Sequence, residues 1–433
     1  MKRALFGVVL AALAAGLILS AQSGRSALPS CDPDNGGLKL PAGFCALLVA
    51  DNLGIARHMV VARNGDLFVS LRDEIGRRAI SGDKPGAVVA LRDSNGDGRF
   101  EVQEKFGNLG GTGIALRNGY LYHAQKAAVV RFPLKEGELK PSGPAEVIAT
   151  LPEQRSHQEK GLAFDGRGGM YVNVGGPSNA CEEEKDRTVG RNPCPELEKQ
   201  GSIWRFDENK TGQSQENGGR RYATGMRQFY ALAWHAGGLY TVQHGREWEK
   251  GFPQYLNSKQ KAELPSEELL RIEEGSNFGW PYCYHDARQG KRVLGPEYGG
   301  DGTKVGDCAK YPAPVATYPG HWAPGALLFY TGSQFPKKYQ GGAFIAFQGS
   351  ANRAPEPEAG YNVVFQPFTG VKPSGTYDVF ADGFAGVTPL MKQADAKARP
   401  GGLAQAPDGS IYISDLVRGR IWRVIYRGGT PTH

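Results

Sequence analysis

The sequence lacks the features that would indicate a nucleic-acid-binding, haem-binding or zinc-binding protein. Its 51 Lys and Arg residues are scattered, so no basic run could follow a phosphate backbone. No two cysteines have the Cys-x-x-Cys spacing typical of zinc sites, and no Cys-x-x-Cys-His string could attach a haem. We therefore expect no nucleic-acid partner and no cysteine-bound metal.

Long apolar runs are also lacking, apart from one at the N-terminus. Two basic residues precede the run Ala4–Ala21, which is rich in Ala, Leu, Val and Gly and ends on small residues. This pattern predicts a secretory signal peptide over residues 1–21, and a single membrane anchor is the alternative. We expect a periplasmic or secreted protein with no stable membrane insertion after cleavage, in which residues 22–433 form one domain.

The six cysteines agree with an oxidising compartment. Six cysteines allow 15 connectivities, but pairing of neighbours along the chain closes three short loops and leaves no free thiol. The pairs that we predict are Cys31 with Cys45, Cys181 with Cys194, and Cys283 with Cys308.

Charged residues make up only 22% of the chain, whereas Gly is abundant at 61 and Pro at 28. This composition favours many short strands joined by tight turns over long helices. One unit recurs six times: a turn containing Gly, followed by a short apolar strand with an aromatic residue and then by a second strand. The six copies of the first strand begin at Asn64, Asn118, Gly168, Gly237, Gly341 and Asp408.

A further apolar stretch precedes each Gly turn, so that three strands are visible in each unit and there is room for a fourth. These stretches are Met59–Ala62, Gly113–Leu116, Gly161–Phe164, Ala231–Trp234, Gly325–Phe329 and Gly402–Ala404. The pattern predicts an all-β fold, a six-bladed β-propeller, with a β-sandwich as the alternative. The segment Phe44–Ala50 precedes the first unit, and we expect it to help close the ring.

In a propeller the innermost strand of each blade runs along the central channel, so the residues at the starts of these strands meet at one mouth. Three arginines and two histidines are among them, and a cationic mouth favours an anionic ligand. Alternatively, each arginine pairs locally with an acid. The residues at the six starts are Arg57–His58, Gly111–Thr112, His157–Gln158, Arg227–Gln228, Pro324 and Arg399.

Several strings in this order resemble a known family of propeller enzymes. The strings His157–Phe164 (HQEKGLAF), Gly225–Gln228 (GMRQ) and Asn277–Pro281 (NFGWP) resemble the soluble PQQ-dependent glucose and aldose dehydrogenases. The strings Gly349–Arg353 (GSANR) and Arg399–Leu403 (RPGGL) resemble the sorbosone dehydrogenase branch. The resemblance runs from about Leu40 to the C-terminus.

The resemblance implies a PQQ-dependent sugar dehydrogenase in which hydride passes from an aldose or sorbosone-type sugar to the quinone. It makes His157 the general base, with a structural histidine as the alternative, and it places Arg227 at the quinone oxygen. It also implies a Ca²⁺ ion held by the backbone carbonyls of Gly245 and Arg246, and an unidentified electron acceptor. The cofactor-binding residues that the resemblance implies are Arg227, Gln228, Asn352, Arg353 and Arg399.

The sequence departs from the family pattern at the mouth. Thr112 stands where a Gln is frequent, Gln228 replaces an Asn, and the pair Asn352–Arg353 replaces a Lys. These departures leave open whether PQQ is retained and which sugar is used. Two other functions remain as alternatives: a calcium-dependent lactonase-type hydrolase and a non-catalytic binding propeller.

A second candidate metal site is independent of the family. Asp93, Asn95, Asp97 and Glu104 stand at positions 1, 3, 5 and 12 of a calcium-loop pattern, with Gly98 at position 6. The alternative is a polar hairpin turn, in which Asp, Asn and Gly are equally common. We consider a structural Ca²⁺ at this loop as a hypothesis.

Overall fold

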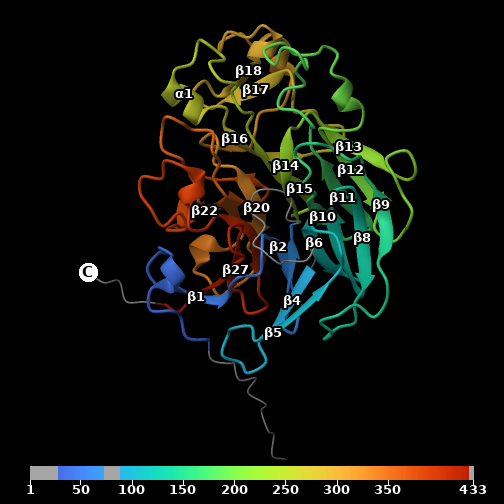
Figure 1. The fold of residues 1–433 in the computed structure, drawn as a ribbon, viewed down its shortest axis with the longest axis vertical. Coiled ribbons are helices and arrows are strands. Elements are labelled where there is room, and N and C mark those ends of the chain that lie inside the picture. Colours follow the sequence, from blue (N-terminus) through green and yellow to red (C-terminus); the bar gives the residue numbers. More distant parts are fainter. Residues whose placement is uncertain (1–27, 73–87, 429–433) are drawn as a thin grey trace, which may run out of the picture.

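The computed structural model describes residues 28–72 and 88–428, which form six four-stranded antiparallel sheets around a central axis (Figure 1). The predicted all-β, six-bladed propeller is thereby confirmed. The predicted signal peptide over residues 1–21 lies outside the described residues. Among the described residues, no helix is both long and apolar enough to cross a membrane.

Blades one to three are each built from four strands that follow one another in the chain. They are β2 (Ala56–Val61), β3 (Leu67–Leu71), β4 (Val88–Arg92) and β5 (Val102–Phe106); β6 (Gly111–Arg117), β7 (Tyr120–Gln125), β8 (Ala128–Pro133) and β9 (Glu146–Thr150); and β10 (Leu162–Phe164), β11 (Gly169–Val174), β12 (Ser202–Asp207) and β13 (Arg220–Thr224).

Blades four and five carry insertions, and blade six takes its outermost strand from the N-terminal part of the chain. The strands are β14 (Gln228–His235), β15 (Gly238–His244), β16 (Glu267–Ile272) and β19 (Ala316–Tyr318); β20 (Pro324–Phe329), β21 (Ala343–Phe347), β22 (Asn362–Gln366) and β25 (Asp378–Ala381); and β26 (Pro400–Gln405), β27 (Ile411–Asp415), β28 (Ile421–Tyr426) and β1 (Phe44–Ala50).

The pairing of β1 with β28 closes the ring, as predicted. Phe44 lies opposite Tyr426, and the antiparallel register continues to Leu48, opposite Trp422. The first and last strands of the propeller therefore share one sheet, and Figure 1 shows β1 beside the C-terminal strands. A closed ring leaves no open first or last blade from which further strands could extend.

Apolar side chains fill the six spaces between neighbouring blades. Successive residues of a strand point to opposite faces, so one strand contributes to two of these cores. In β11, Met170 and Val172 pack toward blade two, whereas Tyr171 packs toward blade four. The alternation explains why the middle strands are buried along their whole length.

Glycines let the inner strands approach one another around the axis. A Cβ on Gly161 would lie 2.0 Å from the carbonyl oxygen of Tyr230 in the next blade. A Cβ on Gly402 would lie 2.1 Å from the carbonyl oxygen of Arg57. Any larger residue at these positions would push two blades apart.

Insertions in blades three and four pack together at the top of the view in Figure 1. They include α1 (Ser258–Glu263) and the hairpin of β17 (Cys283–Asp286) with β18 (Lys291–Leu294). The hydroxyl of Tyr298 donates to the carbonyl of Ala180 at 2.8 Å and thereby ties two insertions together. The smaller elements are β23 (Phe368–Thr369), β24 (Lys372–Pro373) and the 3-10 turns η1 (Asn35–Gly37), η2 (Pro195–Glu198), η3 (Pro296–Tyr298), η4 (Gly306–Lys310), η5 (Lys337–Tyr339) and η6 (Gln393–Asp395).

The three disulfides join the cysteines that the sequence predicts. They are Cys31–Cys45, Cys181–Cys194 and Cys283–Cys308, and no described cysteine is free. The second closes the insertion between β11 and β12, and the third closes the insertion that contains β17 and β18. Both therefore brace the loops beside the candidate site.

Candidate functional site

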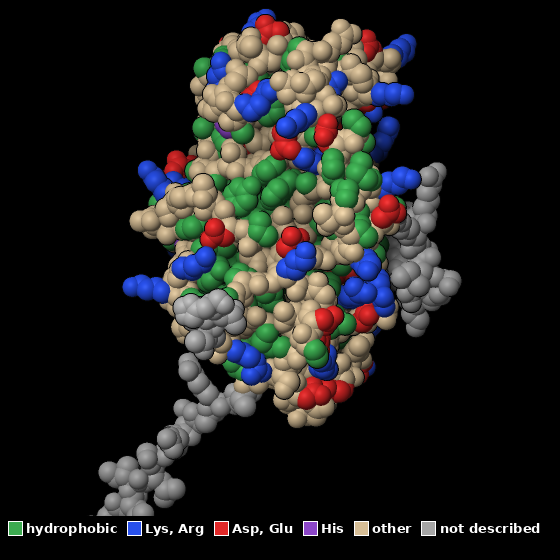
Figure 2. Space-filling view, turned by 90° about the vertical axis from the view of Figure 1, so that its left-hand side faces the viewer, with side chains coloured by type: hydrophobic (Ala, Val, Ile, Leu, Met, Phe, Trp, Pro, Cys, Tyr) green, Lys and Arg blue, Asp and Glu red, His purple; other side chains and the backbone are tan. Residues whose placement is uncertain are grey.

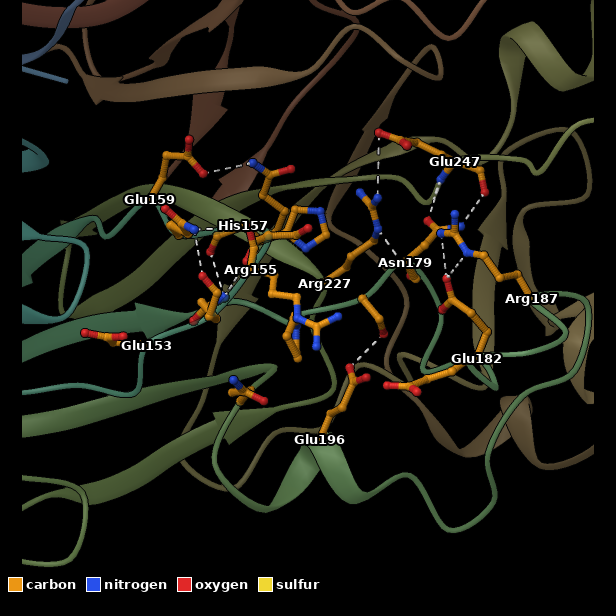
Figure 3. Close-up of a pocket in the computed structure, with 18 of the residues that line it drawn as sticks. Glu153, Arg155, His157, Glu159, Asn179, Glu182, Arg187, Glu196, Arg227 and Glu247 are labelled. Atoms are coloured by element: carbon orange, nitrogen blue, oxygen red, sulfur yellow. Dashed lines mark hydrogen bonds and ion pairs between the residues drawn. The ribbon is translucent and has the colours of Figure 1, made fainter. Parts of the chain in front are cut away.

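A polar cavity of about 1130 Å³ opens beside the axis, over blades three and four (Figure 3). Its walls come from five places: the end of β3, the segment before β10, the insertion between β11 and β12, the start of blade four, and the loop after β15. The lining residues are Arg72, Glu153, Gln154, Arg155, Ser156, His157, Gln158, Glu159, Pro177, Ser178, Asn179, Glu182, Glu183, Glu184, Arg187, Arg191, Glu196, Gln200, Arg227, Gln228 and Glu247.

His157 is held in this wall in one tautomer. Its Nδ1 lies 2.5 Å from the carbonyl oxygen of Gly176, and because a carbonyl only accepts, Nδ1 carries the proton. Burial and the nearby Arg227 guanidinium lower the pKa of His157 to about 3. The ring is therefore neutral near pH 7, and Nε2 is its accepting nitrogen.

The segment that carries His157 is braced by side chains. Nε2 of Gln154 donates to the carbonyls of Ser156, His157 and Gly175, at 2.7, 2.9 and 3.1 Å. Nε2 of Gln158 donates back to the carbonyl of Gln154 at 2.7 Å. His157 itself has a φ of 53°, a left-handed conformation that is uncommon for a non-glycine residue. We call residues 154–158 the arch.

Arg227 lies at the start of blade four and is 4% exposed. Its Nε donates to the carbonyl of Asn179 and one terminal nitrogen donates to the carbonyl of Gly245, both at 3.2 Å. Its nearest carboxylate is that of Glu247 at 3.7 Å, on a half-exposed side chain. Most of the positive charge is thus uncompensated in a buried wall, where it would stabilise negative charge strongly.

The arginine of the first blade is neutralised by an acid to which sequence reasoning gave no role. A terminal nitrogen of Arg57 lies 3.2 Å from Glu159, and Arg72 lies 3.9 Å from the same carboxylate oxygen. Burial opposes ionisation, but Arg57 and Arg72 outweigh it and lower the pKa of Glu159 to about 2. Glu159 is part of the string HQEKGLAF, but no local pattern reveals that its partners come from blade one.

Two other predicted cofactor residues, Gln228 and Arg399, lie in the cavity wall and next to the axis, respectively. Gln228 lines the cavity and its Nε2 donates to Glu159 at 3.4 Å. Arg399 donates to the carbonyls of Gln348 at 2.9 Å and Gly349 at 2.7 Å, next to the axis and outside the cavity wall.

Arg353 does not reach the cavity, contrary to the placement that the resemblance implied. Its guanidinium donates to the carbonyls of Pro357, Ala262 and Gly320 and to the carboxylate of Glu263. It therefore ties the segment after β21 to α1. The neighbouring Asn352 is exposed and also lies outside the cavity wall.

The predicted calcium ligands Gly245 and Arg246 lie next to Arg227. The Gly245 carbonyl faces the Arg227 guanidinium, and the Gly245 N–H donates to Glu267 at 2.8 Å. The Arg246 side chain forms a buried ion pair with Glu297 and so points away from the cavity. The Gly245 carbonyl, which the resemblance assigns to Ca²⁺, thus accepts from Arg227 here.

The predicted calcium loop is assembled differently from the pattern. Glu104 lies on β5 and pairs with Lys140 at 2.7 Å, so it is not part of the loop. Glu101 takes its place, with carboxylate oxygens within 4.8 Å of those of Asp93 and Asp97. Asp93 accepts from the N–H groups of Gly96 and Gly98 at 2.7 and 2.8 Å, and Asn95 accepts from the N–H of Asp97 at 2.8 Å, so these oxygens already cap a turn.

Comparisons with known proteins identify one family, and they find solved structures with a similar fold. A family model described as TrAA12-like matches residues 38–427. A curated relative, an uncharacterised protein of Borreliella burgdorferi, is 29% identical over 165 residues. That match covers 38% of this chain and spans only 40% of the relative.

The solved structures that resemble the chain cover nearly all of it at low identity. A carbohydrate-active enzyme of family AA12 from Trichoderma reesei, in a calcium structure, has a TM-score of 0.71 and 16% identity, and covers 93% of this chain and 99% of that one. The holo PQQ domain of pyranose dehydrogenase from Coprinopsis cinerea has a TM-score of 0.69 and 15% identity, and the match covers 90% of this chain and 97% of that one. The PQQ-bound aldose sugar dehydrogenase of Streptomyces coelicolor has a TM-score of 0.53 and 17% identity, and the match covers 89% of this chain and 100% of that one.

Proposed function

The chain belongs to the TrAA12-like family, and we propose that it oxidises an aldose or a related sugar with PQQ and Ca²⁺ at the described cavity. The observation that carries the proposal is the pairing of a neutral, oriented His157 with a buried, largely uncompensated Arg227 in one cavity wall. A base and a site for developing negative charge are the two groups that hydride transfer from an alcohol requires.

The cavity fits the cofactor in size and in donor chemistry. Its volume of about 1130 Å³ exceeds the roughly 300–1,000 Å³ typical of ligand pockets, which leaves room for PQQ and a sugar together. PQQ carries three carboxylates, and Arg227 offers a buried guanidinium whose nearest carboxylate, that of the half-exposed Glu247, lies 3.7 Å away. The carbonyls of Gly245 and Arg246 would offer oxygen ligands to Ca²⁺.

Each wall residue has a separate task in the proposed reaction. When bound, PQQ supplies a quinone that accepts the hydride of the sugar carbon. Nε2 of His157 takes the proton from the sugar hydroxyl, while the Gly176 carbonyl keeps the ring oriented through Nδ1. The Arg227 guanidinium stabilises the negative charge that develops on the accepting side. The arch keeps His157 in its strained backbone conformation.

The charges of the site favour this reaction over a lactonase-type hydrolysis. A channel metal of that kind needs a ring of carboxylate and amide ligands at the mouth. The starts of the inner strands instead carry Arg57, His58, His157, Arg227 and Arg399. Glu159, an acid at this level, is already paired with Arg57.

The decisive experiment is reconstitution of the purified protein with PQQ and Ca²⁺, followed by absorbance of the bound quinone and by sugar oxidation with an artificial electron acceptor. We expect binding, turnover of at least one aldose, and loss of both with a calcium chelator. His157→Ala should bind PQQ but not turn over, whereas His235→Ala, at the far end of β14, should behave as wild type. A wild-type protein that binds no PQQ at any calcium concentration would leave the non-catalytic binding propeller as the better description.

A further inference from the structure

Arg155 is a cavity residue that neither the sequence motifs nor the resemblance singles out. It lies two residues before His157 on the arch, and its guanidinium projects into the space between His157, Arg227 and Glu196 (Figure 3). Nε2 of Gln158 donates to its backbone carbonyl at 3.0 Å. The backbone of Arg155 is therefore fixed while its side chain remains exposed to the cavity.

Every other arginine of the cavity wall has a carboxylate within 4.0 Å, although the one nearest to Arg227 is on a half-exposed side chain. The pairs are Arg72 with Glu159 at 3.9 Å, Arg187 with Glu182 at 2.8 Å, Arg191 with Glu196 at 2.5 Å, and Arg227 with Glu247 at 3.7 Å. Across residues 28–72 and 88–428, Arg155 has no ion pair. It is thus a full positive charge in the cavity that no described acid neutralises at close range.

A tricarboxylate needs a cation besides Arg227 and Ca²⁺ if each carboxylate is to have a partner of its own. The two other arginines assigned to it by the resemblance are engaged elsewhere, because Arg353 binds three carbonyls and Glu263, and Arg399 binds the carbonyls of Gln348 and Gly349. The cofactor would leave a carboxylate without a partner if the cavity offered no further cation.

We infer that Arg155 binds a carboxylate of PQQ, in the role that the resemblance gave to Arg353. The inference rests on the proposed function. Arg155 and His157 then act from one arch: the first holds the cofactor and the second receives the proton. Because both are fixed by Gln154 and Gln158, the distance between cofactor and base is set by five consecutive residues.

The test measures cofactor affinity without turnover. The protein without cofactor is titrated with PQQ at fixed Ca²⁺, and binding is followed by quenching of tryptophan fluorescence and by equilibrium dialysis. Arg155→Gln should raise the Kd about tenfold, the effect of losing a charge-assisted hydrogen bond that is partly open to water. Arg155→Lys should recover part of the affinity. Lys185→Gln, which removes an exposed cation of the insertion between β11 and β12 outside the cavity wall, should change the Kd less than twofold.

The possible outcomes separate the inference from the proposed function. Wild type without measurable PQQ binding removes both. Binding by wild type with the same Kd in Arg155→Gln and Lys185→Gln refutes the inference and leaves the proposed function in place. An unchanged Kd with a raised KM for the sugar in Arg155→Gln assigns Arg155 to the substrate, and this also refutes the inference. Equal melting temperatures of the variants exclude misfolding as the cause.

Discussion

Replacing Glu159 by Gln should destabilise the protein at neutral pH, because the carboxylate neutralises two arginines at the axis. Arg57 is 4% exposed, and its Nε has no hydrogen-bond partner among the described residues. Its other close contact is the hydroxyl of Tyr230 at 3.4 Å. Without the carboxylate, Arg57 would be a buried cation with almost no compensation.

The size of the effect follows from the titration of Glu159. The paired arginines lower its pKa from 4.5 to about 2, and a tenfold change in proton affinity corresponds to about 1.4 kcal/mol. The carboxylate thus contributes at most roughly 3 kcal/mol to folding at pH 7. Because the side chain keeps 15% of its exposure, we expect a loss of about 2–3 kcal/mol in Glu159→Gln.

The sign of the pH dependence is fixed by the direction of the change. A carboxyl whose pKa is lowered on folding stabilises the native state above its unfolded pKa, and this contribution disappears as the pH falls through the native value. The difference between wild type and Glu159→Gln should therefore be constant above about pH 5 and shrink toward pH 2.

Urea denaturation at a series of pH values measures this difference. The control is Glu153→Gln, because Glu153 is exposed in the same segment and forms no ion pair among the described residues. We expect the control to match wild type at every pH. Equal stabilities of Glu159→Gln and wild type at pH 7, or a difference of the same size at pH 3 and pH 7, would show that the carboxylate does not neutralise Arg57 as described.

Three further predictions concern the base and the acidic turn. His157→Ala should lose roughly two to four orders of magnitude in turnover, the usual contribution of a positioned general base, while PQQ titration shows an affinity close to wild type. In the protein without cofactor, the His157 ring should stay neutral down to about pH 4, because burial and Arg227 lower its pKa to about 3; histidine NMR should show no titration between pH 5 and 8. Asp93→Ala should destabilise the protein by about 1–2 kcal/mol, since two N–H groups lose their acceptor, and an equal loss with and without Ca²⁺ in urea denaturation would identify the loop as a turn.

Much of the fold was predictable because propeller strands are locally encoded. Alternating apolar residues between Gly turns predict strands, and six copies predict six blades. The inner strand of blade five was expected over Gly325–Phe329 and occurs over Pro324–Phe329. The stretch expected before the first Gly turn, Met59–Ala62, overlaps the second half of β2, which ends at Val61. Pairing of neighbouring cysteines followed from the same local logic.

The calcium-loop pattern shows where local reasoning fails. The spacing of oxygen ligands predicted Glu104 at the twelfth position of the loop. In the structure Glu104 is instead part of β5, which pairs with β4. Ala90 lies opposite Glu104 in the β4–β5 hairpin, so the side chain is placed by the register of the sheet. The calcium-loop pattern comes from loops between helices, and it does not anticipate a strand that starts at Val102, before the twelfth position.

The sequence by itself determined the number of blades, the disulfide pairs and the fact that His157 and Arg227 precede inner strands. Only the tertiary structure decided which charges remain available for a ligand. The sequence does not distinguish the roles of four arginines. In the structure Arg57 forms an ion pair with Glu159 and Arg155 lines the open cavity. Arg227 donates to backbone carbonyls in the cavity wall, and Arg353 donates to backbone carbonyls of other loops. The physical reason is that the charge available for binding depends on acceptors within a few ångströms, and in a closed ring these acceptors come from blades far apart in the chain.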